Sequence, residues 1–493
     1  MKTTELDQNP VREFDAQAAS FLVRDLRRVY ASGKTRDYGW RVSQLRMVEK
    51  MATDCEKEIY EALRLDLNKP EIESFVHEIS LTKASCQTML KELKHWMAPQ
   101  KAKAPLTVFP ASAEIVSEPL GVVLVISTWN YPLLLSLDPV IGAIAAGNAV
   151  VLKPSEVAPA TSTLLARILP RYVDSSAVRV VEGSVSATSL LLDQQWDKIF
   201  YTGNATIGQI VMSAAAKHLT PVVLELGGKS PVVVDPNTNL EVTVKRIASG
   251  KWGCNNGQTC VSPDYIITTK SFAPKLIEAL KQTLENFYGN DPLNSKDLSR
   301  IVNLKHYNRL TRLLDDDKVC DKIVHGGQKD EKRLSISPTI LLDVPLDSLI
   351  MKEEIFGPLL PIITVDDIEE SFDLISSRSK PLAAYLFTMN KKLEQEFIGT
   401  ISAGGMLIND TALHLTVHSL PFGGVGGSGM GNYHGKFSFD AFSHKKAVLH
   451  RGFAGDASAR YPPFTPKKKA ILKALVIGDL FGLILALLGW PRT

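Results

Sequence analysis

Short apolar runs that alternate with helical spacing dominate the middle of the chain. Five runs rich in β-branched residues occur between positions 121 and 226, which is typical of strands buried on both faces of a sheet. Amphipathic stretches such as 161–168 and 207–216 lie between them, and this alternation predicts βαβ units in a doubly wound parallel sheet. The predicted strands are 121–126, 149–152, 178–181, 198–201 and 221–224.

A second series of apolar runs follows position 228 and predicts a second α/β domain of ordinary size. Before both series, apolar residues recur at helical spacing over 75–97, which predicts a helical N-terminal region. The strands predicted for the second domain are 230–234, 265–268, 323–324, 359–365, 383–388 and 405–409.

Every strand of the first series ends in polar or glycine residues. In open α/β sheets a ligand binds outside the carboxyl ends of the strands, so these five ends are expected to surround one site. They comprise 128–130, 153–156, 182–184, 202–204 and 225–228.

Cys260 and Glu225 are the candidate reactive pair. Cys260 ends the polar, glycine-containing run 253–260, and Glu225 closes the last strand of the first series. A thiolate is the strongest nucleophile among side chains, and a nearby base makes it available at neutral pH. Taken alone, a cysteine is more often inert core packing, so the surrounding chain has to decide.

Composition excludes several classes of protein. The 493 residues exceed what one core supports, and a net charge of +3 without a basic stripe argues against a nucleic-acid partner. The five cysteines are scattered without metal-ligand spacing, so no metal site is expected and a reducing compartment fits. The polar, acidic start (1–20) resembles neither a signal nor a transit peptide.

The C-terminal tail is different in composition. Three lysines (467–469) precede an apolar run at 474–490, which Asp479 interrupts. A spanning helix needs about 20 apolar residues, so the sequence leaves two interpretations open. One is membrane contact through residues 466–493; the other is an amphipathic helix that folds back over the protein.

A glycine-bounded turn after the fourth strand is a candidate phosphate site. It comprises Gly203, Asn204, Ala205, Thr206, Ile207 and Gly208 and opens a helix, whose free N–H groups suit an anion. The alternative is a plain helix cap. Lys153 and Glu156 offer a cation and an acceptor for a ribose, or else belong to a solvated loop.

Seven motifs in order resemble the aldehyde dehydrogenase superfamily, over about residues 24–444. They are 128–132, 153–156, 202–203, 225–229, 257–260, 354–358 and 421–424. The stretches 32–36 and 429–436 are similar to the class 3 branch, which oxidises medium- and long-chain or aromatic aldehydes.

The resemblance implies a role for each matching residue. Cys260 is the nucleophile, the Asn130 amide and the Cys260 N–H hold the oxyanion, and Glu225 activates water. Glu354 and Phe356 fix the nicotinamide ribose and ring. The other cofactor residues are Thr128, Trp129, Lys153, Glu156, Gly203, Asn204, Ala205, Thr206, Ile207, Gly208, Leu226 and Gly227.

Three positions limit the resemblance. Asn204 replaces the usual Ser at the phosphate turn. Glu156 repels a 2′-phosphate, which favours NAD, although class 3 members often accept NADP as well. Cys254 is expected to be packing, with a regulatory disulfide as the alternative.

The resemblance also implies a domain plan and a homodimer. Residues 1–104 and 119–226 form the NAD-binding domain, 227–417 the catalytic domain, and 446–493 the tail. The oligomerisation strands are assigned to 105–118 and 418–445, with extended conformation near 106–116 and 437–442. The expected location is the cytoplasm, with the tail as an attachment to the cytosolic face of the endoplasmic reticulum.

Two other functions compete with this prediction. A CoA-acylating semialdehyde dehydrogenase has the same scaffold but resolves its thioester with a thiol, and the presence of Glu225 argues against it. A catalytically silent, membrane-tethered scaffold is the other, and Cys260, Glu225 and Asn130 argue against that.

Overall fold

The computed structural model describes residues 14–454 and 456–490. They form two compact units, and the larger one runs up to Glu92 and from Pro119 to Phe442. The smaller unit comprises Leu93–Glu118 and the chain from Ser443 onward.

The first sheet of the larger unit is doubly wound. Its order is β17-β7-β6-β3-β4-β5, and all neighbours are parallel except β17 against β7. The chain reverses its direction of winding between β3 and β6, which is where such sheets bind ligands. The strands are β3 (Val122–Ile126), β4 (Ala149–Lys153), β5 (Val178–Val180), β6 (Lys198–Thr202), β7 (Val222–Glu225) and β17 (Gly429–Met430).

Helices alternate with these strands, as the apolar pattern predicts. β3 is buried along its whole length, because helices cover both faces of the sheet. The connecting helices are α6 (Leu134–Ala146), α7 (Pro159–Tyr172), α8 (Val185–Leu192) and α9 (Ala205–Ala216).

The second sheet has seven strands in the order β10-β13-β14-β9-β8-β15-β16, and only β10 runs antiparallel to its neighbour. Its six predicted strands are confirmed, and β13 is an addition that the sequence did not indicate. The strands are β8 (Pro231–Val234), β9 (Tyr265–Thr269), β10 (Ile323–His325), β13 (Thr339–Leu342), β14 (Leu359–Val365), β15 (Ala383–Phe387) and β16 (Gly405–Ile408).

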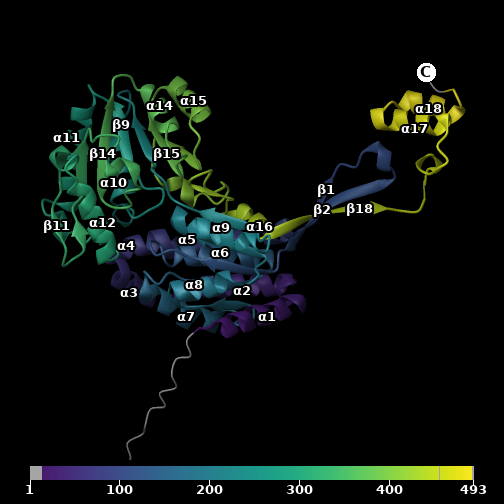
Figure 1. Ribbon diagram of the computed structural model, residues 1–493, viewed down its shortest axis with the longest axis horizontal. Coiled ribbons are helices and arrows are strands. Elements are labelled where there is room, and N and C mark those ends of the chain that lie inside the picture. The colour runs from purple at the N-terminus through teal and green to yellow at the C-terminus, as the bar shows by residue number, and fades with distance from the viewer. Residues whose placement is uncertain (1–13, 455, 491–493) are drawn as a thin grey trace, which may run out of the picture. The chain divides into compact units, whose positions relative to one another are not determined.

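Helices surround this second sheet (Figure 1). A continuous apolar core joins β9 and β14 to the helices through Ile267, Leu310, Leu359 and Phe397. The helices are α10 (Leu240–Lys251), α11 (Ala273–Tyr288), α12 (Leu304–Leu314), α14 (Glu370–Ser376) and α15 (Lys391–Thr400).

The N-terminal region is helical, which confirms the prediction for 75–97. A π-helical turn at Phe75–Ile79 separates α4 from α5. The helices are α1 (Ala16–Ala31), α2 (Tyr38–Asp54), α3 (Glu56–Leu67), α4 (Glu71–Ser74) and α5 (Ser80–Met97).

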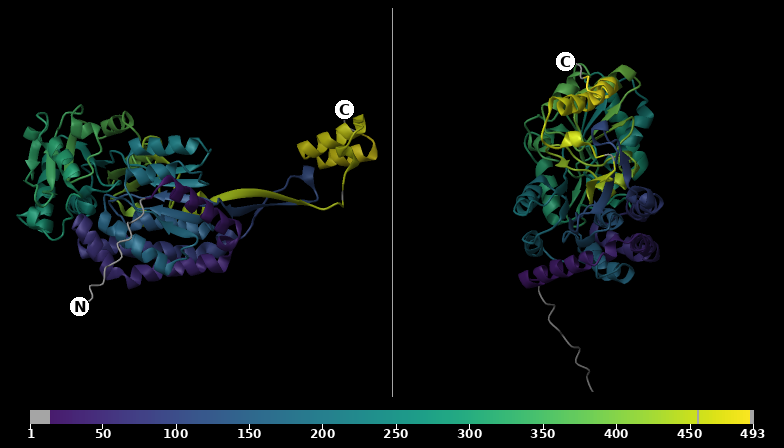
Figure 2. Two further views of the ribbon diagram at one scale, coloured as in Figure 1. Left: turned by 60° about the horizontal axis from the view of Figure 1, so that its bottom comes forward. Right: turned by 90° about the vertical axis from the view of Figure 1, so that its right-hand side faces the viewer.

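The smaller unit contains a three-stranded sheet, whose strands β2 and β18 lie side by side (Figure 2). The strands are β1 (Gln100–Ala102), β2 (Ala111–Pro119) and β18 (Ser443–Arg451). An ion pair and a second polar contact join β18 to β2, with Lys446 Nζ 2.5 Å from Glu118 Oε2 and His450 Nε2 2.9 Å from Glu114 Oε1.

The prediction of an extended conformation at 437–442 is wrong. Residues Gly435–Ala441 form helix α16, and the strand begins only at Ser443. Phe437 and Phe439 alternate with polar residues and so resemble a strand. Phe439 and Phe442 are both buried, however, and their spacing of three places them on one side of a helical turn. Within 106–116, a 3₁₀ helix (Leu106–Val108) precedes β2.

The tail consists of two short helices, α17 (Pro466–Ile477) and α18 (Leu480–Leu488). Gly478 ends α17 in a left-handed conformation, and Asp479 Oδ1 caps α18 by accepting from the Gly482 N–H at 2.7 Å. Among the described residues, no helix combines the length and apolar character needed to cross a membrane.

Candidate active site

A cavity of about 480 Å³ in the larger unit is lined by both Cys260 and Glu225. Its size is in the usual range for a small-molecule site. Thr202 and Leu226, at the ends of β6 and β7, also line it. Many of the remaining lining side chains are apolar and include Leu81, Tyr131, Leu134, Leu135, Phe287 and Phe422.

The loop that carries Cys260 turns through two left-handed residues. Asn255 and Asn256 have φ values of 49° and 50°, a region that asparagine adopts more readily than other non-glycine residues. Glu73 Oε1 accepts from the Asn255 N–H at 2.7 Å, and Gln258 Nε2 donates to the Arg300 carbonyl at 2.9 Å. These bonds fix the backbone that leads to the thiol.

The Cys260 thiol is protonated in the resting structure. Burial, and then the carboxylates of Glu354 and Glu225, raise its pKa to about 12. The thiol must therefore lose its proton to a base as it attacks, because the thiolate is the nucleophilic form.

Glu225 is a buried carboxyl group at the end of β7. It is 3% exposed, and neither of its oxygens has a hydrogen-bond partner among the described residues. Burial raises its pKa well above the ordinary value, because no fixed charge compensates for the lost water. The raised pKa makes Glu225 a stronger base than an exposed carboxylate.

Asn130 is hydrogen-bonded into the Cys260 loop, although it does not line the cavity. Its Nδ2 donates to the Gln258 carbonyl at 3.0 Å, which leaves one amide hydrogen free for another acceptor. The backbone carbonyl of Asn130 accepts a hydrogen bond from Asn255 Nδ2 at 2.7 Å. These hydrogen bonds join Asn130 directly to the loop that carries Cys260, and these are the two candidate elements of an oxyanion site.

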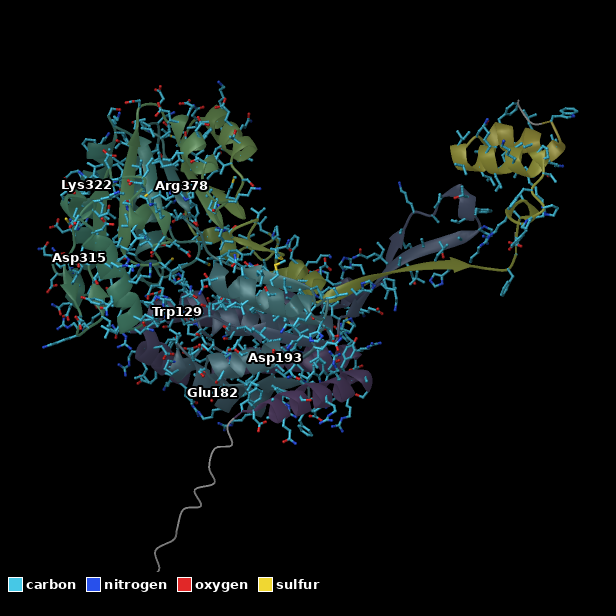
Figure 3. The ribbon with its side chains drawn as sticks, in the orientation of Figure 1. Trp129, Glu182, Asp193, Asp315, Lys322 and Arg378 are labelled. Carbon is cyan, nitrogen blue, oxygen red and sulfur yellow. The ribbon has the colours of Figure 1, made fainter. Side chains whose placement is uncertain are left out.

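Trp129 and Phe356 pack against each other. Their ring centroids are 5.3 Å apart in an edge-to-face arrangement, and the His306 ring lies 4.8 Å from Trp129. Figure 3 shows Trp129 between the two sheets, whereas Glu182 lies beside the first.

Glu354 lies against Gly227. A Cβ at position 227 would collide with the Glu354 carboxylate, so only glycine permits this approach. Burial and the neighbouring Asp264 raise the Glu354 pKa to about 8, while a hydrogen bond from the Gly228 N–H, Lys229 and Arg309 oppose the rise. This carboxyl group offers acceptors for a ribose hydroxyl.

The glycine-bounded turn caps α9. Asn204 Oδ1 accepts from the Ile207 N–H at 3.0 Å, and the Gly203 N–H donates to the Glu225 carbonyl at 3.0 Å. Ala205 and Thr206 at the first turn are exposed, so the helix N-terminus can still receive an anion. The cap and the phosphate interpretations are therefore compatible.

Lys153 and Glu156 form an ion pair after β4, and Thr128 follows β3 at the same edge of the sheet. Lys153 is buried, whereas the Glu156 side chain is 40% exposed. Together with Gly227, Glu354 and the α9 N-terminus, these residues fit a nicotinamide dinucleotide.

Three residues of the site lie in or near the sequence motifs, but sequence reasoning assigned them no part in the chemistry. Tyr131 Oη and Thr259 Oγ1 are 2.7 Å apart, and Thr259 Oγ1 donates to the Cys254 carbonyl at 2.9 Å. Cys254 itself lines the cavity as a free thiol. Tyr131 adjoins Asn130 and Thr259 adjoins Cys260, and that adjacency is the signal that could have found them.

Comparison with known proteins decides the family. The model of the aldehyde dehydrogenase family matches residues 11–448. The chain belongs to the aldehyde dehydrogenase family. It is 66% identical to aldehyde dehydrogenase family 3 member H1 of Arabidopsis thaliana, over 97% of this chain and 98% of that protein. Aldehyde dehydrogenase family 3 member A2 of Rattus norvegicus is 45% identical, over 90% and 92%.

A solved structure supports the same assignment. The substrate-bound state of Staphylococcus aureus AldH matches with a TM-score of 0.90 and 42% identity, covering 93% of this chain and 99% of that one. The predicted α/β fold and class 3 resemblance are confirmed. As a family member, the chain is an NAD(P)-dependent oxidoreductase that converts aldehydes to carboxylates.

Proposed function

We propose that Cys260, Glu225 and Asn130 carry out the aldehyde oxidation. The observation that supports this most directly is a thiol and a buried, unpartnered carboxyl group on the wall of one cavity. The same cavity is largely apolar, which suits medium- or long-chain aliphatic or aromatic aldehydes.

In the first step the Cys260 sulfur bonds to the aldehyde carbon, and its proton passes to water. The resulting oxyanion accepts hydrogen bonds from the free Asn130 amide hydrogen and the Cys260 N–H. One such donor typically contributes about 10²–10³ in rate. When bound, NAD(P)⁺ would accept the hydride that leaves the carbon.

In the second step the thioester on Cys260 is hydrolysed. Glu225 removes a proton from water, the hydroxide adds to the thioester carbon, and the C–S bond breaks. The carboxylic acid leaves and ionises in water, and the Cys260 sulfur takes the proton from Glu225, which restores both the thiol and the base.

The cofactor is assigned to the strand ends described above. Trp129, Phe356, Leu226, Gly227 and Glu354 would hold the nicotinamide end. Lys153 and Glu156 would bind the other ribose, and Thr128 lies beside them. Residues 203–208 would hold the phosphates at the α9 N-terminus. The negative charge of Glu156 favours NAD over NADP.

A burst of NADH on rapid mixing with an aldehyde tests this assignment. We expect Glu225→Gln to retain the burst but to slow the steady state about 10²–10⁴-fold, because hydride transfer precedes the step that needs the base. Normal turnover of this variant would show that Glu225 is not the base. Wild-type turnover without added CoA separates hydrolysis from CoA acylation.

We further propose that the domains divide as the family pattern implies and that two copies form a homodimer. The first sheet would bind the cofactor and the second would carry the nucleophile, with the oligomerisation role assigned to residues 105–118 and 418–445, which contain most of β2 and the start of β18. This assignment draws support from the exposed faces of β18, since an exposed edge strand is a natural site for pairing.

We also propose that the tail attaches the enzyme to the cytosolic face of a membrane such as the endoplasmic reticulum. Its helices expose a set of large apolar side chains, and lysines precede them. Such a pattern suits a helix that lies in a lipid surface rather than one that spans it. The exposed set is Val476, Ile477, Leu480, Phe481, Ile484, Leu487, Leu488 and Trp490.

Cell fractionation with and without residues 466–493 tests the attachment. The full chain should sediment with membranes and the shortened chain should stay in the supernatant. Equal distribution of both forms would exclude an anchor and favour the folded-back helix.

A further inference from the structure

A lysine and a glutamate are fully buried as an ion pair near the proposed oxyanion donor. Lys69 Nζ lies 2.6 Å from Glu78 Oε1, and both side chains have no exposed surface. Desolvation offsets much of the attraction in such a pair, so it contributes little to stability by itself. The hydrogen bonds that the pair makes therefore indicate its role.

The pair binds both ends of the turn that carries Asn130. Lys69 Nζ donates to the Asn130 carbonyl at 3.1 Å and lies 4.1 Å from the centre of the Tyr131 ring. Glu78 Oε2 accepts from the N–H groups of Leu133 and Leu134, at 2.8 Å and 3.3 Å. The turn between β3 and α6 is thus held by one charged pair.

The same N-terminal segment also holds the nucleophile loop. Glu73, five residues before Glu78, binds the Asn255 N–H, and its other oxygen accepts from Ser299 Oγ at 3.0 Å. Asn255 Nδ2 in turn donates to the Asn130 carbonyl, which therefore receives a second donor besides Lys69. Asn130 is held from both sides.

The π-helical turn explains how one segment reaches both loops. The Ser80 N–H bonds to the Phe75 carbonyl, five residues earlier, so the helix is locally wider than an α-helix. Such single π turns occur frequently at functional sites. Here Glu73, two residues before the turn, binds the Cys260 loop, and Glu78, within the turn, binds the Asn130 turn.

We infer that Lys69 and Glu78 are positioning residues that hold the Asn130 amide against the Cys260 loop for oxyanion binding. This inference rests on the proposed function, because it gives Asn130 the oxyanion role. Neither residue touches the substrate: Lys69 acts through the Asn130 carbonyl, and Glu78 acts through Lys69 and the backbone of the turn.

A double-mutant cycle with Asn130→Ala tests the inference. Lys69→Met should lower kcat/KM for the aldehyde by up to about 100-fold, since a misplaced catalytic group commonly costs this much. The KM for NAD should stay within about twofold, because the cofactor residues lie elsewhere. In the Asn130→Ala background the same change should cost less than about threefold, because the group that Lys69 positions is already gone.

Lys198→Met is the matched control. Lys198 is another buried lysine, at the start of β6, and its ammonium lies 3.5 Å from the Val222 carbonyl. The control should leave kcat/KM nearly unchanged in both backgrounds. A purely structural effect of losing a buried lysine would lower activity equally with and without Asn130.

A second variant guards against misfolding, since Lys69→Met leaves the Glu78 charge unpaired. Lys69→Met/Glu78→Gln removes both charges and should show the same dependence on Asn130. Normal kcat/KM in this folded variant, or additive losses with Asn130→Ala, would overturn the inference. Loss of folded protein in every variant would also contradict it, because the pair would then serve stability alone.

The proposed function fails separately from this inference. If Asn130→Ala alone retains full activity, its oxyanion role is wrong. If Asn130→Ala is impaired but shows no coupling to Lys69→Met, only the positioning role is wrong.

Discussion

Two cysteines six residues apart line the same cavity, and burial raises the pKa of both to about 12. They differ in their charged neighbours. Glu73 is the main carboxylate near Cys254, whereas Glu354 and Glu225 lie near Cys260. Only Cys260 is therefore placed beside the proposed base.

This difference predicts opposite outcomes for two alanine variants. Cys260→Ala should lower turnover at least about 10⁴-fold, as is common when a nucleophile is removed. Cys254→Ala should lose less than about tenfold and still release NADH in steady state. If Cys254→Ala were as inactive as Cys260→Ala, the assignment of the nucleophile to Cys260 alone would be wrong.

The ionisation of Cys260 predicts how it reacts with iodoacetamide. Because only the thiolate is alkylated and the pKa is about 12, the modification rate of the enzyme without nucleotide should rise about tenfold per pH unit from 7 to 9. Mass spectrometry of the peptide containing Cys260 measures this rate. A plateau below pH 8 would mean that the thiol is already ionised at neutral pH.

The burial of Lys198 predicts an effect on the stability of the protein. Burial alone lowers its pKa from 10.5 to about 8, so the folded state disfavours its charge by an order of 3 kcal/mol at pH 7. Lys198→Met should therefore raise the free energy of unfolding at pH 7. As the pH rises from 8 to 10.5, only the unfolded lysine still binds a proton, so the free energy of unfolding of the wild type increases. The difference in stability between Lys198→Met and the wild type should therefore shrink.

Urea denaturation at pH 7 and pH 10 measures the free energy of unfolding of the wild type and of Lys198→Met. An advantage of Lys198→Met that is the same at pH 7 and pH 10 would show that Lys198 keeps its charge in the folded protein up to pH 10, so that burial does not lower its pKa to about 8.

At the scale of elements, the start of α9 combines a cap with a proposed phosphate site. Asn204→Ala should lower the free energy of unfolding by about 1 kcal/mol, because the Ile207 N–H loses its acceptor. It should also raise the KM for NAD. Asn204→Ser should restore stability and cofactor binding, since a serine hydroxyl caps equally well. Thermal unfolding and steady-state kinetics with varied NAD provide the two measurements.

The elements differ in how well their sequences predict them. The buried strands β3 and β14 are continuous apolar runs between turns, and this pattern is sufficient to predict them from the sequence. β13 is only four residues long, and its apolar residues show no period that separates them from a loop. α16 was misread because a seven-residue helix with alternating phenylalanines fits both periods.

The candidate site divides in the same way. Cys260, Glu225 and Asn130 belong to local motifs at strand ends, where one sequence is sufficient to propose them. Lys69 and Asn130 are 61 residues apart in the chain, and a lysine in a helical region resembles any solvated charge. Such partners become visible only when the fold brings them together.

At the scale of the whole molecule, the proposed dimer depends on the smaller unit. Leu449 is an apolar residue on β18 with 53% of its surface exposed. Leu449→Asp should shift the enzyme from dimer toward monomer, because a buried unpaired charge opposes association. Leu449→Val keeps the apolar surface and should remain dimeric. Light scattering of the form without residues 466–493 measures the mass, and a monomeric wild type would exclude the proposal.

The antiparallel pairing of β17 with β7 has a consequence for how the enzyme is made. Glu225 pairs in register with Gly429, and the Leu226 N–H bonds to the Ser428 carbonyl, about two hundred residues further along the chain. During synthesis the strand that ends in the base therefore remains an open edge until residue 429 has left the ribosome. A nascent chain released before that point lacks the outermost strand beside Glu225, so prematurely terminated products should be inactive even though they contain every proposed catalytic residue.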